Sequence, residues 1–125
     1  MGGGDDRVLS RIGRMADGWL VSPGLRGNLE GAREHIVKIH AAAREAGRDP
    51  AEIDIIFRTH EYSLGASRMA RLPFTGNADD IAADIRQYQA LGVSQLIVDF
   101  ARTSRTLDEL YGHMEALAMQ VWPRV

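Results

Sequence analysis

The segment from Asp99 to Thr106 gathers the side chains best suited to binding an anion. It follows an apolar run and precedes an expected helix, whose free amides and dipole favour negative charge. We therefore expect its cationic and hydroxyl side chains to bind a phosphate or a carboxylate. A capped helix start with solvated arginines is the alternative. The candidate residues are Arg102, Thr103, Ser104 and Arg105.

The histidines offer less. His60 and Glu61 supply a base beside a carboxylate, but successive residues of a strand point to opposite faces and do not share one pocket simply. His35 and His40 are separated by five positions in an expected helix, a spacing that does not place them on one face. We expect no metal site, and we assign no catalytic residue.

Composition limits the class of protein. The chain has 125 residues, a formal charge of −2 and no cysteine, which indicates one domain over residues 1–125 without disulfides or thiolate ligands. The near-neutral charge does not indicate a nucleic-acid partner. No apolar run reaches the roughly 18 residues that a membrane span needs, and the first residues lack a signal-peptide core. We expect a cytoplasmic protein with no membrane partner.

Apolar periodicity predicts alternating helices and strands. Capping signals and helical spacing predict about four helices, over residues 5–16, 28–46, 77–91 and 107–121. Short apolar runs predict about three strands, over residues 19–21, 53–59 and 95–100. Residues 60–75 follow no regular pattern, although Arg68 and Arg71 lie there with His60.

This alternation implies βα units with right-handed crossovers and a parallel sheet. Ligands of such sheets bind outside the carboxyl ends of the strands, where residues 22–27, 60–62 and 99–106 would lie. A complete (β/α)8 barrel needs about 250 residues. A sheet of three parallel strands leaves two edges open, which favours association. We therefore expect the chain to pair with itself or with a missing half.

One run is more specific. Residues 11–19, RIGRMADGW, resemble the R-x-A-R-x-A-D-G-W segment of the bacterial luciferase-like family of flavin-dependent monooxygenases and F420-dependent oxidoreductases. Three further segments match the family in order: Gly2-Gly3, the AGRDPAEI turn at 46–53, and the helix-and-strand unit at 76–100. Trp19 itself lies at a strand start, away from the ligand rim, so we expect it to pack between helix and sheet.

The resemblance implies the C-terminal part of a (β/α)8 barrel, roughly its last three strands. In the family, FMN or F420 binds at the carboxyl ends of the strands, and the Gly-Gly loop contacts its phosphate. By this resemblance Gly2, Gly3 and Gly4 are cofactor-binding, with the 102–105 loop on the same rim. The family's catalytic residues lie in the absent early strands.

The implied function is hydride transfer or oxygen activation on a small organic substrate, in a homo-oligomer or with a complementing N-terminal half. Two other interpretations remain open. One is a non-catalytic, self-associating α/β module or barrel remnant, as the open sheet edges suggest. The other is an anion-binding domain that uses the 102–105 loop. The sequence does not distinguish FMN from F420, and it does not identify the substrate.

Overall fold

The computed structural model describes residues 4–21 and 29–125. The chain divides into two compact units. Unit 1 comprises Met1–Arg58 and Leu91–Ile97, and unit 2 comprises Thr59–Ala90 and Val98–Val125. That the two units act as the single domain expected from the sequence stays a prediction.

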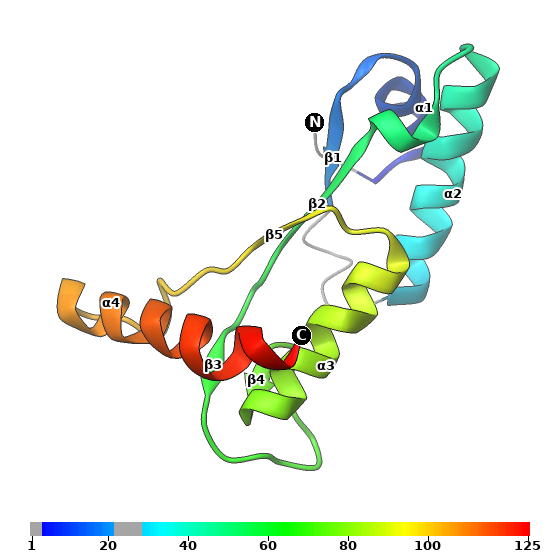
Figure 1. Cartoon of the computed structure of the whole chain (residues 1–125). Helices are drawn as coiled ribbons and strands as arrows, with labels where there is room; N and C mark the ends of the chain where they lie inside the picture. The colour runs from blue at the N-terminus through cyan, green and yellow to red at the C-terminus, as the bar shows by residue number, and fades with distance from the viewer. Residues whose placement is uncertain (1–3, 22–28) are drawn as a thin grey trace. The chain divides into compact units, whose positions relative to one another are not determined.

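Unit 1 contains a parallel three-stranded sheet (Figure 1). Its order is β1-β2-β5, with β1 at Gly18–Leu20, β2 at Asp54–Arg58 and β5 at Gln95–Ile97. Register pairs Trp19 with Ile55 and Phe57 with Leu96. The three predicted strands are confirmed, but β5 is shorter than the apolar run that predicted it. The central strand β2 buries Ile55 and Phe57 on one face.

Two helices of unit 1, α1 (Asp6–Met15) and α2 (Leu29–Glu45), pack against each other (Figure 1). They approach so closely at Gly13 that a Cβ added there would lie 2.3 Å from the carbonyl oxygen of Ile39. Glycine is therefore required at this crossing because a larger residue has no space there. Conformational freedom is not the reason, because the φ of Gly13 is not positive. The predicted start of α2 at Asn28 lies outside the described residues.

The two motifs at 11–19 and 46–53 meet in unit 1. The guanidinium of Arg48 donates to the carbonyl oxygens of Gly13 and Ala16, both at 3.0 Å, and so satisfies carbonyls at the end of α1. Trp19 is fully buried, with its ring 5.8 Å from that of His35 on α2. Both motifs therefore build the corner between α1 and the sheet, as expected for Trp19.

Two glycines and an aspartate stabilise turns at the ends of helices. Gly47 and Gly92 follow α2 and α3 (Ala78–Leu91) with φ of 73° and 108°, in the left-handed region that favours glycine. Asp49 caps the short helix η2 (Pro50–Glu52), since its carboxylate accepts from the amide of Ala51 at 2.9 Å.

Unit 2 contains helices that the sequence predicted and a short strand pair that it did not predict (Figure 1). The pair joins residues 63–64 to 75–76 in parallel, inside the stretch predicted to be irregular. The helix predicted over 107–121 is α-helical to residue 116 and then continues as a wider π-helical turn. The bounds are β3 Ser63–Leu64, β4 Thr75–Gly76, α3 Ala78–Leu91, α4 Leu107–Ala116, η3 Leu117–Val121 and η4 Trp122–Arg124.

Candidate functional site

The segments after β2 and β5 meet in unit 2. The amide of Asp99 donates to the hydroxyl of buried Thr59 at 2.9 Å. This bond joins the two segments just after the β2–β5 pairing ends at Arg58 and Ile97. Close by in the chain, Arg102 donates to Glu61 at 2.9 Å. The Arg102 side chain is 61% exposed and that of Glu61 27%, so this ion pair faces solvent. Glu61 is therefore engaged with Arg102.

Unit 2 also contains a cluster of three rings, those of Tyr62, Phe100 and His113. The ring of Phe100 meets Tyr62 edge-on at 5.0 Å and stacks parallel to His113 at 6.3 Å. The Nε2 atom of His113 lies 3.1 Å from the carbonyl oxygen of Thr103. Burial raises the pKa of Tyr62. The sequence placed His113 in a helix and gave no signal that it would contact the 99–106 loop.

The two predicted hydroxyl residues of this loop differ. Thr103 donates its hydroxyl to the carbonyl oxygen of Phe100 at 3.2 Å, so it shapes the loop. Ser104 donates its amide to the same carbonyl at 2.9 Å. Its Oγ atom is buried and has no hydrogen-bond partner among the described residues. Ser104 is thus the member of the predicted set with unused polar capacity.

The start of α4 is capped by the chain's own side chains. The Thr106 hydroxyl accepts from the amide of Glu109 at 3.2 Å, and the Glu109 carboxylate accepts from the amide of Arg105 at 2.6 Å. This arrangement resembles a capping box, although the carboxylate accepts from the residue before the N-cap, and it occupies two amides at the helix start. The exposed Arg105 side chain keeps its positive charge. Anion binding by Arg102, Thr103, Ser104 and Arg105 stays a prediction.

The predicted phosphate loop lies at the other end of the chain. Gly2 and Gly3 fall outside the described residues. Gly4 is half-buried and directly precedes Asp5, whose carboxylate caps α1 by accepting from the amide of Val8 at 3.0 Å. A carboxylate thus already occupies one free amide of this helix start.

The next residue carries a second carboxylate. Asp6 accepts from Lys38 at 2.6 Å, and this hydrogen bond lowers the pKa of Asp6 and raises that of Lys38. Lys38 therefore offsets one of the two negative charges beside Gly4. A phosphate here would still face the charge of Asp5, so the fit to a phosphate is partial at this end.

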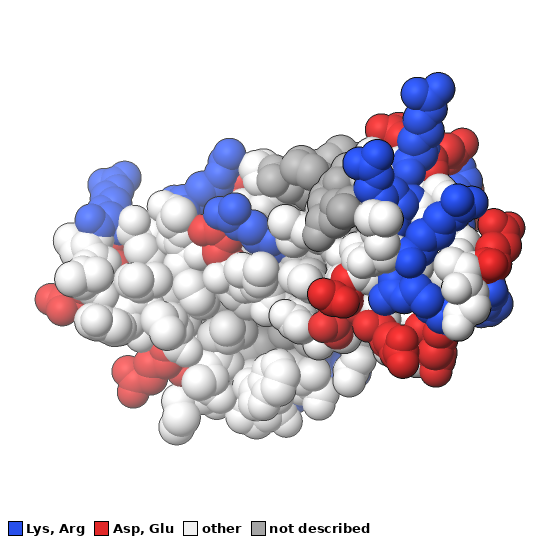
Figure 2. Space-filling view, turned by 90° about the horizontal axis from the view of Figure 1, so that it is seen from above, with Lys and Arg blue, Asp and Glu red and all other residues white. Residues whose placement is uncertain are grey.

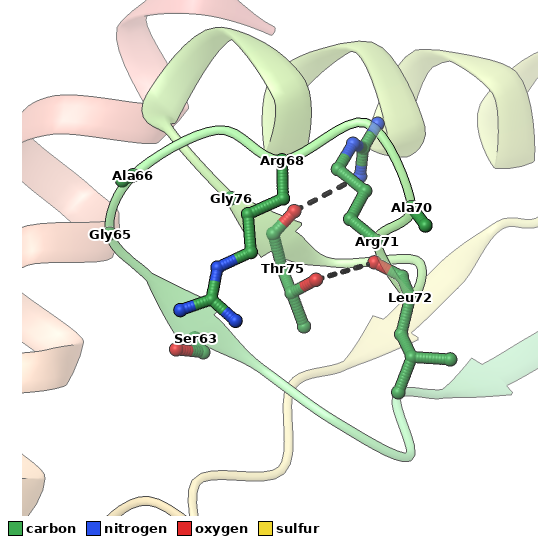
Figure 3. Close-up of a pocket in the computed structure, with 9 residues that line it drawn as sticks. All are labelled: Ser63, Gly65, Ala66, Arg68, Ala70, Arg71, Leu72, Thr75 and Gly76. Carbon is green, nitrogen blue, oxygen red and sulfur yellow. Dashed lines mark hydrogen bonds between the residues drawn. The ribbon is translucent and has the colours of Figure 1, made fainter.

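A cavity of about 350 Å³ opens beside β3 and β4 in unit 2 (Figure 3). None of the residues that line it was predicted to form a site, because their stretch shows no periodic pattern. Its lining is small and polar, with two arginines and no carboxylate. The lining residues are Ser63, Gly65, Ala66, Arg68, Ala70, Arg71, Leu72, Thr75 and Gly76.

A buried ion pair holds one wall of this cavity. Arg71 binds Asp84 with two nitrogens, at 2.5 and 2.9 Å, and also donates to the carbonyl oxygen of Thr75 at 3.0 Å. Asp84 additionally accepts from the amide of Phe74 at 2.8 Å. Phe74 has a φ of 64°, which is unusual for a residue with a side chain. The hydrogen bond to Asp84 raises the pKa of Arg71 and keeps it charged.

The start of α3 closes the same wall. Asn77 and Asp80 cap each other reciprocally, with distances of 3.0 and 2.9 Å, as their spacing predicted. Gly76 has a φ of 118°, and a Cβ there would lie 2.5 Å from the Asp80 carboxylate. A hydrogen bond from the Ser67 hydroxyl, followed by the amide of Asn77, lowers the pKa of Asp80.

The surface carries charges of both signs. Figure 2 shows one face that is mostly covered by residues other than Lys, Arg, Asp and Glu, with groups of both signs beside one another at its right-hand end. Within residues 4–21 and 29–125, no group of three or more His, Asp or Glu side chains is placed to hold a metal ion. No helix in that part of the chain has the length and apolar character needed to cross a membrane.

These elements define an α/β chain of parallel βα units, part of a (β/α)8 barrel. The chain is similar to a solved structure, the coenzyme F420 dependent tetrahydromethanopterin reductase from Methanopyrus kandleri, with a TM-score of 0.75 and 17% sequence identity. The match covers 98% of this chain and 49% of the reductase, so the chain spans about half of the reductase's length. This likeness establishes the fold and confirms the predicted fold class.

No protein-family model and no curated protein matches the chain. The shared fold agrees with the resemblance that residues 11–19 and 46–53 carry, because both point to a partial barrel.

Proposed function

We propose that this chain is the C-terminal portion of a luciferase-like oxidoreductase that uses F420 or FMN on a small organic substrate. The observation that carries the proposal is the fold match over 98% of the chain with an F420 dependent reductase. The family-like segments at 11–19 and 46–53 support it, because they build the same corner of the fold. F420 is favoured over FMN, since the similar reductase is described as F420 dependent.

The cofactor, when bound, supplies hydride transfer, or oxygen activation in the case of FMN. In this proposal the chain binds and orients it. By the family resemblance, residues 2–4 would contact its phosphate. The 102–105 loop, with the charge of Arg105, is proposed as a second anion-binding segment. Ser104 would offer its unused hydroxyl. Arg102 contributes less, because Glu61 already neutralises it.

The chain spans about half of the reductase's length. We propose that a complementing N-terminal half, or a second copy of this chain, completes the cofactor site. The early strands of the barrel would then supply the catalytic residues, because the family's catalytic residues lie in strands that have no counterpart in this chain.

A fluorescence titration tests the proposal. F420 and FMN are added to the purified chain alone, and to the chain co-purified with the product of the coding sequence immediately upstream. We expect saturable binding of one cofactor, and weaker binding by Arg105→Ala. The matched control is Arg33→Ala, which removes an exposed arginine from α2. Absence of binding in both preparations would contradict the proposal.

A second candidate function is self-association without catalysis. It is favoured by a row of exposed apolar side chains on α4, at Leu107, Tyr111 and Met114, which are 67%, 61% and 49% exposed. Their spacing of three and four residues places them on one helix face. Such a face favours burial against a partner. Light scattering decides this candidate, and a monomer at all concentrations would exclude it.

A further inference from the structure

The cavity beside β3 and β4 contains a positive charge that no described residue neutralises. Of its two arginines, Arg71 is paired with Asp84 at 2.5 Å and with Asp80 at 3.8 Å. Arg68 makes no ion pair or hydrogen bond with any described residue. Figure 3 shows its side chain reaching across the cavity toward Ser63, whereas Arg71 turns away from Ser63. The cavity therefore keeps the full charge of Arg68.

Other donors surround this charge. The backbone amides of residues 66–70 make no backbone hydrogen bond within the described chain. The Ser63 hydroxyl lines the cavity and is exposed. The Thr75 hydroxyl donates to the carbonyl oxygen of Leu72 at 2.7 Å, so it shapes the wall and does not supply a free donor. Free amides of a loop, a hydroxyl and a guanidinium are together the groups that bind oxyanions.

The cavity also has room for a ligand. Gly65, Ala66 and Ala70 place small side chains on its wall, and its volume of about 350 Å³ lies at the lower end of the usual range for small-molecule pockets. No lining residue is acidic, so no internal carboxylate competes for Arg68. This contrasts with the start of α4, where Glu109 already occupies an amide.

The wall opposite Arg68 is rigidly held. Asp84 binds both Arg71 and the amide of Phe74, which fixes the loop between the arginines and β4. A wall that is held in place before binding loses less entropy when the ligand arrives. The cavity thus combines an unpaired cation with a preformed wall.

From these observations we propose that the cavity is a binding site for a small organic oxyanion, a phosphate ester or a carboxylate, with Arg68 as its charged ligand and Ser63 and the 66–70 amides as neutral donors. This site is separate from the proposed cofactor contacts and does not depend on F420 or FMN.

An NMR titration of the ¹⁵N-labelled full chain tests the site. Inorganic phosphate and succinate are added in separate arms at constant ionic strength. We expect saturable shifts of the 66–70 amides in at least one arm. Stronger binding of phosphate assigns the ligand to phosphate esters, and stronger binding of succinate assigns it to carboxylates.

Variants then separate a specific site from general charge. Arg68→Gln should weaken the affinity about tenfold or more, because a charge-assisted hydrogen bond is lost. Ser63→Ala should weaken it less. Arg33→Ala removes the same charge from α2 and should leave the affinity unchanged. Circular dichroism confirms that each variant is folded. The proposal is overturned if the 66–70 amides show no saturable shift with either anion, or if Arg68→Gln binds as tightly as the original chain.

Discussion

Tyr62 places a hydroxyl in the core of unit 2 without a hydrogen-bond partner among the described residues. Its side chain is 1% exposed and its ring packs on Phe100. A buried hydroxyl without a partner destabilises the fold, typically by about 1–3 kcal/mol. The ring, by contrast, contributes apolar burial that phenylalanine reproduces. The hydroxyl and the ring of Tyr62 therefore have opposite effects on stability.

We predict that Tyr62→Phe leaves the free energy of unfolding at pH 7 unchanged or raises it by up to about 1 kcal/mol. Burial raises the pKa of Tyr62 above its usual value of 10.0, so above that pH the unfolded state ionises while the folded state stays protonated. The stability present below pH 10 is thus lost as the pH rises. Urea denaturation at a series of pH values from about 8 to about 11 should show a smaller alkaline loss of stability for Tyr62→Phe than for the original chain.

The control is Tyr111→Phe, since Tyr111 is 61% exposed on α4. Its alkaline loss should match that of the original chain. Parallel pH curves for the original chain and Tyr62→Phe would show that the buried hydroxyl does not ionise as argued.

Asp84 is the residue on which the 71–75 loop depends. It accepts two hydrogen bonds from Arg71 and one from the amide of Phe74, which has a positive φ. Its removal leaves a cation and an amide without their acceptor. We predict that Asp84→Ala lowers the free energy of unfolding by about 3 kcal/mol, the lower part of the range for breaking buried pairs. Urea denaturation at pH 7 measures this.

Asp79→Ala is the matched control. Asp79 lies on the same helix and pairs with Arg124 at 3.3 Å, but its side chain is 83% exposed. Exposed pairs contribute about 1 kcal/mol or less. A loss for Asp84→Ala no larger than that of Asp79→Ala would mean that the loop does not depend on the buried pair.

Elements of unit 1 are held by a close helix crossing. A Cβ at Gly13 would lie 2.3 Å from the Ile39 carbonyl oxygen and 2.8 Å from the Cβ of Ala42, so α1 and α2 would have to separate. We predict that Gly13→Ala destabilises the chain by about 1–3 kcal/mol, as overpacking usually does. Thermal unfolding followed by circular dichroism measures the change.

Gly112→Ala gives the opposite result in the same assay. Gly112 lies within α4, and a Cβ there meets nothing within 4 Å. Alanine in a helix interior is about 0.5–1 kcal/mol more favourable than glycine, so the midpoint should rise. Two variants of equal or reversed stability would show that space at the crossing does not decide the effect.

The sequence predicted elements where local signals are strong. Asp5 and Asn77 cap the helices predicted to begin at residues 5 and 77, and Gly47 and Gly92, with positive φ, follow the helices predicted to end at residues 46 and 91. It could not predict β3 and β4, because two-residue strands have no periodicity and they pair across an irregular stretch of the chain. For the same reason the cavity lined by Arg68 was missed.

The 99–106 loop shows a similar limit. Its residue types predicted an anion site, and the helix that follows begins at Leu107 as expected. However, the pairing of Arg102 with Glu61 and the contact of His113 with Thr103 join segments up to 41 residues apart. Spacing in a sequence carries no information about such contacts, so the composition of the site could be predicted and its internal pairing could not.

On the scale of the whole molecule, this chain spans about half the length of the reductase whose fold it shares. The sheet of unit 1 has β1 and β5 at its edges, and α4 of unit 2 exposes Tyr111 and Met114. Among the described residues of unit 1, no further strand pairs with the outer edges of β1 and β5. Each unit therefore supplies an independent reason for association.

We predict that the molar mass measured by light scattering rises with concentration, because burial of the α4 face removes apolar surface from water. Met114→Glu places a charge on that face and should shift the chain toward the monomer. Val37→Glu is the control, because it introduces the same charge on a different helix. Val37 is 61% exposed on α2, beside Glu34 and Lys38. Equal association of both variants would show that the contact does not involve α4, and a monomeric original chain at all concentrations would contradict the prediction.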